Sequence, residues 1–367
     1  MSGNEIPPCS YEYTREFEDD FDADSLDLTK WKLQDFGQGE TNGSDKEGYY
    51  SLDNISLLKE SGISFCRVTA KKETVIRRAV SWKPDNEILE DGLPNRRTFY
   101  YTSSNIWSQD EYLYGKYEMR CRMPGGKGFW PAFWMFGGSP WNEIDVFDNY
   151  GGITKLETSI GYGEKPHHNG CPQEYSNFDF STWHTFTCFF TPAKIGWFID
   201  HTLVRVSNRY YFNTDPEPIS CESAGANGNY YELQAYPRGK MHIVFGLQIG
   251  SGNGPCEAPD GQTQFPAAFD IDYIKFFRQE ARSSFCDDVS ISLFPNPTSG
   301  LFEIKFDNND SSCKAIFVSD MIGKSVWQKI NTTESSFTID LSHYPSGVYI
   351  IKIMFKDCVV VKNLVYF

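Results

Sequence analysis

The sequence predicts an all-β protein, and three observations support this prediction. Short segments that alternate apolar and polar residues recur along the chain, as strands with one buried face require. Aromatic residues make up 16% of the chain, a content that favours strands over helical bundles. Stretches rich in Gly, Pro, Asn and Ser separate the alternating segments, as turns between antiparallel strands do. Together these features are typical of an antiparallel β-sandwich.

The clearest strand is predicted at 114–123. Tyr117, Met119, Cys121 and Met123 alternate there with charged residues, so one face of the strand is expected to be buried. Four later segments alternate in the same way: 183–190, 194–200, 240–249 and 269–277.

Chain length and composition predict two domains. The 367 residues exceed one average domain, and the stretch 279–289 is polar and lacks periodicity. The net charge of −15 belongs to the residues before 290, because 290–367 contains seven basic and seven acidic residues. We therefore predict a first domain at 1–279, a linker at 280–289 and a smaller all-β domain at 290–367.

The charge and hydropathy also limit the partners. A strongly acidic chain does not favour nucleic acid or an anionic membrane surface, since both need basic patches. No apolar run approaches the roughly 20 residues that span a bilayer. We expect no nucleic-acid partner, no membrane span and a neutral polymer as substrate.

The segment 141–151, WNEIDVFDNYG, contains three carboxylates: Glu143, Asp145 and Asp148. Strict alternation would turn Asp148 into the core, where an unpaired carboxylate is costly. A β-bulge at 146–147 would add one residue and bring Asp148 to the face of the other two acids. The alternative is an ordinary strand whose acids face solvent.

Three carboxylates on one face are suited to glycoside hydrolysis. A retaining glycosidase uses one carboxylate as nucleophile and a second, about 5 to 5.5 Å away, as general acid and then base. The segment 125–141 adds Trp130, Trp134 and Trp141, whose ring faces can stack on sugars, and Trp107 is a fourth candidate. A structural role in the core is a good explanation for one such tryptophan, but a poor one for three tryptophans that lie close to three acids.

These residues resemble glycoside hydrolase family 16, which includes laminarinases, lichenases, agarases and carrageenases. The motifs that carry the resemblance lie at 17–31, 114–136, 143–148, 183–204 and 269–279, and it covers roughly residues 12–279. It implies a concanavalin-like β-jelly-roll sandwich and chemistry without a catalytic cofactor.

The resemblance also implies roles for the acids: Glu143 as nucleophile, Asp145 as assisting acid and Asp148 as general acid and base. Position 148 departs from the family, which has Glu there; Asp is shorter by about 1.5 Å. A misplacement of about 1 Å can cost on the order of a hundredfold in rate. The alternatives are a working hydrolase, a weak one, or a glycan-binding protein without turnover. We predict a hydrolase, because a binding-only descendant would have had no reason to keep Glu143.

A second departure concerns the strand after the acids. Laminarinase-like members have a His there, whereas this chain has Gly161 and Tyr162. His167 and His168 lie farther on, and we expect them to line the cleft or face water rather than bind metal.

Family frequency favours an endo-acting enzyme for β-1,3-glucan of the laminarin type. Galactans of the agar or carrageenan type are the alternative substrates. A sulfated polymer also stays a possible substrate, because its negative charge could be bound by Arg77, Arg78, Arg96 and Arg97.

The family often holds a structural calcium ion with N-terminal carbonyls and an Asp on the last strand, which Asp272 matches. A surface Asp without an ion is the equal alternative. The weakest interpretation is a lectin-like protein in which the three acids bind calcium.

The residues from 290 onward resemble the C-terminal sorting domain of the type IX secretion system. The sequences FPNPTSG, DMIGK and PSGVYI occur there in that order. The resemblance implies an immunoglobulin-like sandwich, the type IX machinery as partner, and a bacterial protein that is secreted or held at the cell surface. We expect a monomer. The alternative is an accessory β-domain that binds sugar.

Overall fold

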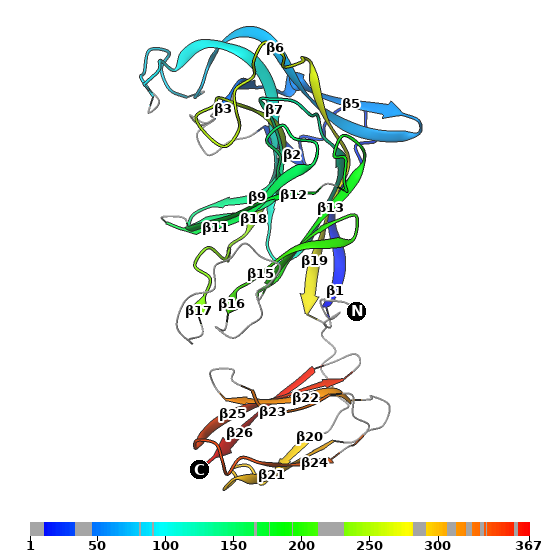
Figure 1. Ribbon diagram of the computed structural model, residues 1–367, viewed down its shortest axis with the longest axis vertical. Helices are drawn as coiled ribbons and strands as arrows, with labels where there is room; N and C mark the ends of the chain where they lie inside the picture. Colours follow the sequence, from blue (N-terminus) through cyan, green and yellow to red (C-terminus); the bar gives the residue numbers. More distant parts are fainter. Residues whose placement is uncertain are drawn as a thin grey trace. The chain divides into compact units, whose positions relative to one another are not determined.

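The prediction of an all-β protein is confirmed by the computed structural model (Figure 1). The structure describes residues 11–33, 46–80, 82–89, 92–164, 167–175, 177–192, 194–211, 231–281, 291–306, 313–320, 325–330, 334, 336–355 and 359–367. Within these ranges it contains strands and one short 3-10 helix, η1 (Leu52–Asn54), and no helix there is long and apolar enough to cross a membrane. The chain divides into two compact units, Tyr13–Gln279 and a second that contains Glu280–Phe367. The linker predicted at 280–289 lies almost entirely outside the described residues.

The first unit consists mainly of two antiparallel sheets. We call one the site sheet. Its neighbouring strands are, in order, β12 (His167–Glu174), β11 (Lys155–Gly163), β10 (Trp141–Asp148), β9 (Phe129–Gly138), β18 (Met241–Gly250), β7 (Arg96–Tyr112) and β2 (Trp31–Leu33).

We call the other the back sheet. It runs β15 (Thr202–Asn208), β14 (Lys194–Ile199), β13 (His184–Phe190), β8 (Gly115–Arg122), β19 (Ala267–Ala281), β6 (Ile63–Arg78) and β5 (Ile55–Glu60). Shorter or outlying strands are β1 (Tyr11–Asp19), which pairs with β19, β3 (Lys46–Glu47), β4 (Tyr49–Tyr50), β16 (Tyr210–Tyr211) and β17 (Tyr231–Glu232). All five strands predicted from alternation are present, as β8, β13, β14, β18 and β19.

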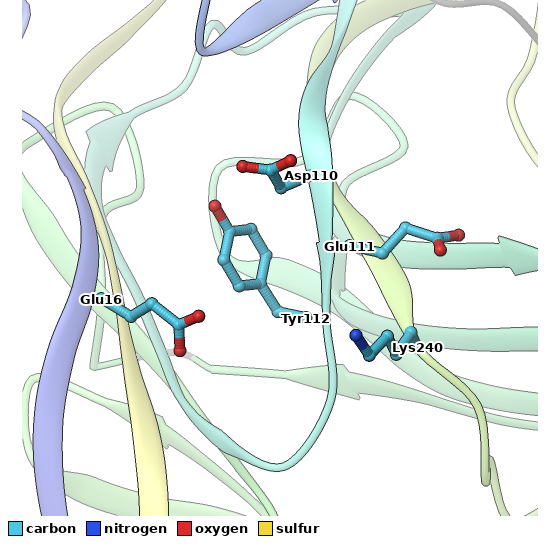
Figure 2. A pocket seen from close by; sticks show the side chains of 5 residues that line it. All are labelled: Glu16, Asp110, Glu111, Tyr112 and Lys240. Atoms are coloured by element: carbon cyan, nitrogen blue, oxygen red, sulfur yellow. The ribbon is translucent and has the colours of Figure 1, made fainter.

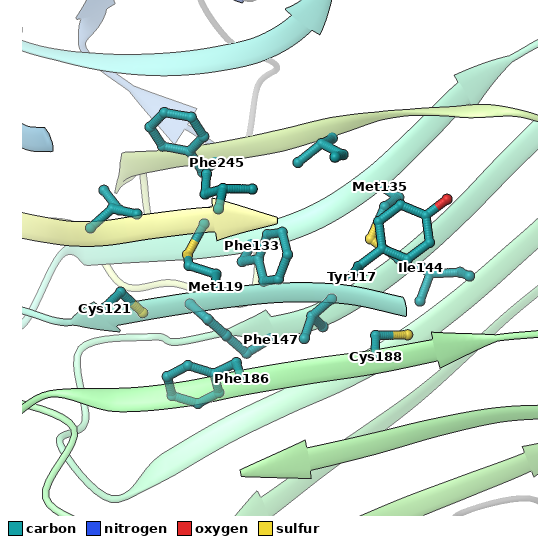
Figure 3. Close-up of a cluster of buried hydrophobic side chains, with 14 of the residues drawn as sticks. Tyr117, Met119, Cys121, Phe133, Met135, Ile144, Phe147, Phe186, Cys188 and Phe245 are labelled. Atoms are coloured by element: carbon teal, nitrogen blue, oxygen red, sulfur yellow. The ribbon is translucent and has the colours of Figure 1, made fainter. Parts of the chain in front are cut away.

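A hydrophobic core lies between the two sheets (Figure 3). Strand β8 contributes Tyr117, Met119 and Cys121, the alternate residues that the sequence predicted to be buried. Strands β9 and β10 of the site sheet contribute Phe133 and Phe147 from the opposite side. Full burial of such a side chain contributes roughly 1.5 to 3 kcal/mol, so this layer fixes which face of each strand points inward. The other face of β9 and β10 remains for the site.

The second unit has two sheets of its own. One consists of β20 (Ile291–Phe294), β21 (Leu301–Phe306) and β24 (Ser336–Asp340), and the other of β23 (Ser325–Ile330), β22 (Cys313–Asp320), β25 (Gly347–Phe355) and β26 (Val359–Tyr366). Buried side chains from both sheets, among them Phe302, Ile316 and Tyr349, form one cluster. The unit therefore has its own core, and its immunoglobulin-like topology stays a prediction.

Candidate active site

Strand β10 contains the predicted β-bulge. Against β9, Asp145 opposes Trp134 and Phe147 opposes Phe133, so Val146 is an extra residue without an opposite partner in that strand. The register against β11 shifts at the same place, between Asp145 and Asp148.

The bulge places the acids on one face of the site sheet. Ile144 and Phe147 point into the core between the sheets (Figure 3). Asp148 instead accepts a hydrogen bond from Trp130 Nε1, and Trp130 belongs to a separate aromatic cluster. The structure thus brings Glu143, Asp145 and Asp148 together on the outer face, as the sequence predicted.

Asp145 occupies the middle of the row and is buried, with 6% of its surface exposed. Ser159, directly opposite in β11, donates its hydroxyl hydrogen bond to Asp145 Oδ2. The backbone carbonyl of Asp145 accepts a hydrogen bond of 2.9 Å from Trp197 Nε1 of the back sheet. These contacts fix the strand where the bulge begins.

Glu143 lies at one end of the row. Trp141 Nε1 donates a hydrogen bond of 2.7 Å to Glu143 Oε2. His168 Nδ1 lies 3.9 Å from the same oxygen, although β12 and β10 are separated by β11. Burial lowers the pKa of His168, which favours the neutral ring.

Asp148 lies at the other end of the row. Trp130 Nε1 donates a hydrogen bond of 2.6 Å to Asp148 Oδ1, and the ring of Tyr150 lies 5.1 Å from that of Trp130. Glu157 stands directly opposite Asp148 in β11. Burial raises the pKa of Glu157, against the opposing effects of Arg205 and a hydrogen bond from Tyr150. Burial, followed by the negative charge of Asp148, raises the pKa of Tyr150 as well.

All four predicted tryptophans lie in one aromatic cluster beside the acids. The cluster contains Trp107, Trp130 and Trp134, with Trp141 packed against it, and it is distinct from the core between the sheets. The first three are at most 8% exposed, so they form the floor of the site rather than open platforms. Trp141 is only partly buried and is the best placed of the four to stack on a sugar ring.

The sequence reasoning missed Ser159, Glu157 and Tyr150, and it gave His168 no role beside the nucleophile. The first two alternate along β11 and face the acids through the strand register. The alternation of residues 156–161, LETSIG, indicates a strand, but it does not specify which residue lies opposite which acid.

Asp272, the predicted calcium ligand, pairs with an arginine. Its carboxylate accepts a hydrogen bond from Arg120 and forms an ion pair with it. Among the described residues there is no group of three or more His, Cys, Asp or Glu side chains that could hold a metal ion. The guanidinium supplies a positive charge at Asp272, and the calcium ion stays a prediction. The N-terminal carbonyls of the prediction lie in part outside the described residues.

The four arginines considered for a sulfated polymer lie on the hairpin of β6 and β7. Arg77 opposes Arg97 and Arg78 opposes Arg96. Asp85 is 2.5 Å from Arg78 and 3.9 Å from Arg96, so part of this positive charge is neutralised within the chain.

A pocket of about 350 Å³ lies elsewhere in the first unit (Figure 2). Its lining residues are Glu16, Asp110, Glu111, Tyr112 and Lys240. None of the predicted site residues lines this pocket, and we assign it no role in the chemistry.

A match to a family model shows which protein family the chain belongs to. The model described as glycosyl hydrolases family 16 matches residues 67–252, which is half of the chain and includes all three acids. The chain belongs to glycosyl hydrolase family 16. A second model, of a secretion system C-terminal sorting domain, matches residues 292–366. The protein is therefore exported, to the cell surface or the medium.

Curated relatives of this family 16 chain include glucanases. It is 26% identical over 194 residues to a beta-glucanase of Rhodothermus marinus, an alignment that covers 48% of this chain and 63% of the relative. It is 25% identical over 190 residues to a glucan endo-1,3-beta-glucosidase of Cryptopygus antarcticus, which covers 48% and 66%. The chain thus spans less than two thirds of either relative.

Solved structures agree with the family 16 fold. The laminarinase catalytic domain of Thermotoga maritima MSB8 matches with a TM-score of 0.53 and 21% identity, over 73% of this chain and 98% of that domain. The predicted β-jelly roll of the first unit is confirmed.

Proposed function

We propose that this family 16 protein is a retaining, endo-acting hydrolase of β-linked polysaccharide, with β-1,3-glucan as the first substrate. The observation that carries the proposal is the bulge at Val146, which sets Glu143 and Asp148 on one face with Asp145 between them. A neutral polymer suits the net charge of −15.

In the proposed first step, Glu143 attacks the anomeric carbon while the bond to the leaving oxygen breaks. Asp148 gives its proton to that oxygen, and a covalent glycosyl–enzyme ester forms. In the second step Asp148 takes a proton from water, the water oxygen attacks the anomeric carbon, and Glu143 leaves as a carboxylate. Asp145, between the two, tunes their pKa values.

The environments of the two ends support these roles. The nucleophile has to be ionised, and Glu143 accepts an indole hydrogen bond of 2.7 Å, which favours its charged form. The general acid has to hold a proton, and Asp148 faces Glu157 and Tyr150, whose pKa values burial raises.

The shorter side chain at position 148 does not by itself argue against catalysis. Trp130 Nε1 lies 2.6 Å from Asp148 Oδ1, and Trp130 is 93% buried, so its indole is held by packing. A defined donor at this distance supports a site adapted to Asp.

The glucan preference rests on the relatives, since two of them are named as a beta-glucanase and a glucan endo-1,3-beta-glucosidase. We also propose the type IX secretion machinery as the partner of the second unit, because of the sorting-domain match.

Purified protein should release reducing ends from laminarin, with lichenan, agarose and carrageenan as competing substrates. Glu143→Gln is the matched control, because it keeps the shape of the side chain and removes the nucleophile. Binding to a polymer without any product from it would defeat the enzyme proposal and favour the glycan-binding alternative.

A further inference from the structure

His168 on β12 lies directly opposite Gly161 on β11. Gly161 opposes Glu143 on one side and His168 on the other, so the three residues lie in a row across three strands. Side chains at paired positions of antiparallel neighbours share a face. His168 and Glu143 therefore share a face, with the glycine between them.

Gly161 leaves the space that the imidazole occupies. A Cβ atom at this position would lie 2.9 Å from both His168 Cε1 and Nδ1, closer than carbon and ring atoms pack in proteins. The backbone of Gly161 has no positive φ that would require glycine. Position 161 thus lacks a side chain because the His168 ring crosses over its backbone.

The crossing ring meets the proposed nucleophile and its donor. His168 Nδ1 lies 3.9 Å from Glu143 Oε2, and the rings of His168 and Trp141 meet edge to face at 5.9 Å and 80°. Trp141 Nε1 donates to the same Oε2. Two rings that contact each other thus lie beside this carboxylate and limit where it can turn.

We propose that His168, admitted by Gly161, is a positioning residue that holds Glu143 and Trp141 in the geometry for attack. This inference rests on the proposed function. It assigns His168 to the orientation of the nucleophile and not to proton transfer with the substrate. Its side chain is 47% exposed, whereas that of Glu143 is 15% exposed, so the ring forms the outer wall on this side of the carboxylate.

The first test is a double-mutant cycle on laminarin hydrolysis. His168→Ala should lower kcat roughly tenfold with little change in KM, because a misplaced nucleophile slows the reaction more than it weakens binding. Gly161→Ala should cause a similar loss by displacing the ring. In the His168→Ala background, Gly161→Ala should cost almost nothing, since the space is then empty. Equal costs of Gly161→Ala in both backgrounds would overturn the proposal.

Two variants serve as comparisons. His168→Asn keeps a polar atom close to the position of Nδ1 and should recover most of the rate. His167→Ala removes the adjacent imidazole, which opposes Tyr162 and points to the other face of β12, and should leave the rate unchanged. Equal losses from His167→Ala and His168→Ala would mean that β12 is merely destabilised, and the proposal would fail.

A second test does not depend on turnover. Proton NMR follows the titration of the His168 ring, identified as the resonance missing from His168→Asn. Glu143 is the charged group that the described residues place against this ring, so Glu143→Gln should lower the pKa of His168 by about half a unit or more. The pKa values of the other histidines should not move. An unchanged His168 would contradict the contact. If the wild-type protein hydrolyses nothing, the proposed function fails in the assay, whereas this titration still decides whether the two residues interact.

Discussion

The two ends of the acid row are built alike and differ in what surrounds them. Each outer carboxylate accepts a hydrogen bond from an indole: Glu143 from Trp141 at 2.7 Å and Asp148 from Trp130 at 2.6 Å. Trp141 belongs to the same strand as its acid and is partly exposed, whereas Trp130 comes from the neighbouring strand and is buried.

The two ends differ in their neighbouring acids. At the Glu143 end stands His168, a partly exposed ring, and no carboxylate opposes Glu143 in β11 because the paired residue is Gly161. At the Asp148 end stand Glu157, directly opposite, and Tyr150, both with pKa values raised by burial. The residues opposite the two outer acids thus differ, and we propose that this difference suits them to different steps.

The largest effect is expected from removal of the nucleophile. Glu143→Gln should lower kcat by on the order of a thousandfold or more, because no other group can form the covalent ester. In Glu143→Ala, which empties the space of the carboxylate, sodium azide should restore turnover of an activated aryl glycoside and give the α-glycosyl azide. Activity that survives in Glu143→Gln would place the nucleophile elsewhere.

Asp148 should come next. Asp148→Asn should lower kcat/KM on polysaccharide by roughly a hundredfold or more, and much less on an aryl glycoside whose leaving group needs no proton. With azide this variant should give the β-glycosyl azide, after two displacements. The opposite azide products of the two variants would establish the difference between the ends.

Restoring the usual family residue is a separate test of the same end. Asp148→Glu should lower kcat roughly tenfold, because the longer side chain has to displace the buried Trp130 from its hydrogen bond. A gain in kcat would show that Asp is a handicap in this chain and that the site has not been adapted to it.

Loss of either indole donor should give a smaller effect, and the two losses should move different limbs of the pH profile. Loss of a hydrogen bond to a carboxylate raises its pKa. Trp141→Phe should move the acid limb of kcat/KM to higher pH, because Glu143 has to be ionised. Trp130→Phe should move the alkaline limb to higher pH, because Asp148 has to be protonated. Movement of the same limb in both variants would contradict the assignment of the two ends.

The smallest effect is expected at Glu157, and it is one of stability. Its raised pKa means that its contribution to folding stability is complete below the unfolded pKa of about 4.5 and is lost as pH rises through the folded pKa. Glu157→Gln should therefore flatten the fall in Tm above that pH. Glu174→Gln, at an exposed glutamate of β12, is the matched control and should leave the slope unchanged.

Some features of the acid row could be predicted from the sequence, and others could not. The bulge was predictable, because without it Asp148 would lie in the core beside Ile144 and Val146. The role of Glu157 and the position of His168 were not, because they depend on the registers of β11 and β12, which the connecting turns set.

The tryptophans illustrate the same limit. They were predicted to stack on sugar, and the structure places all four beside the acids. Two of them, Trp130 and Trp141, also donate hydrogen bonds to the outer carboxylates, a role that ring size and spacing alone do not indicate.

The stereochemistry of the first product is the most direct test of the central claim that Glu143 and Asp148 act by double displacement. Proton NMR of a laminarin digest, recorded before mutarotation, gives the anomeric configuration of the new reducing end. The account predicts the β anomer, with later conversion to the equilibrium mixture. Initial release of the α anomer would mean a single displacement by water, which requires carboxylates about 6.5 to 9.5 Å apart, and would contradict the account.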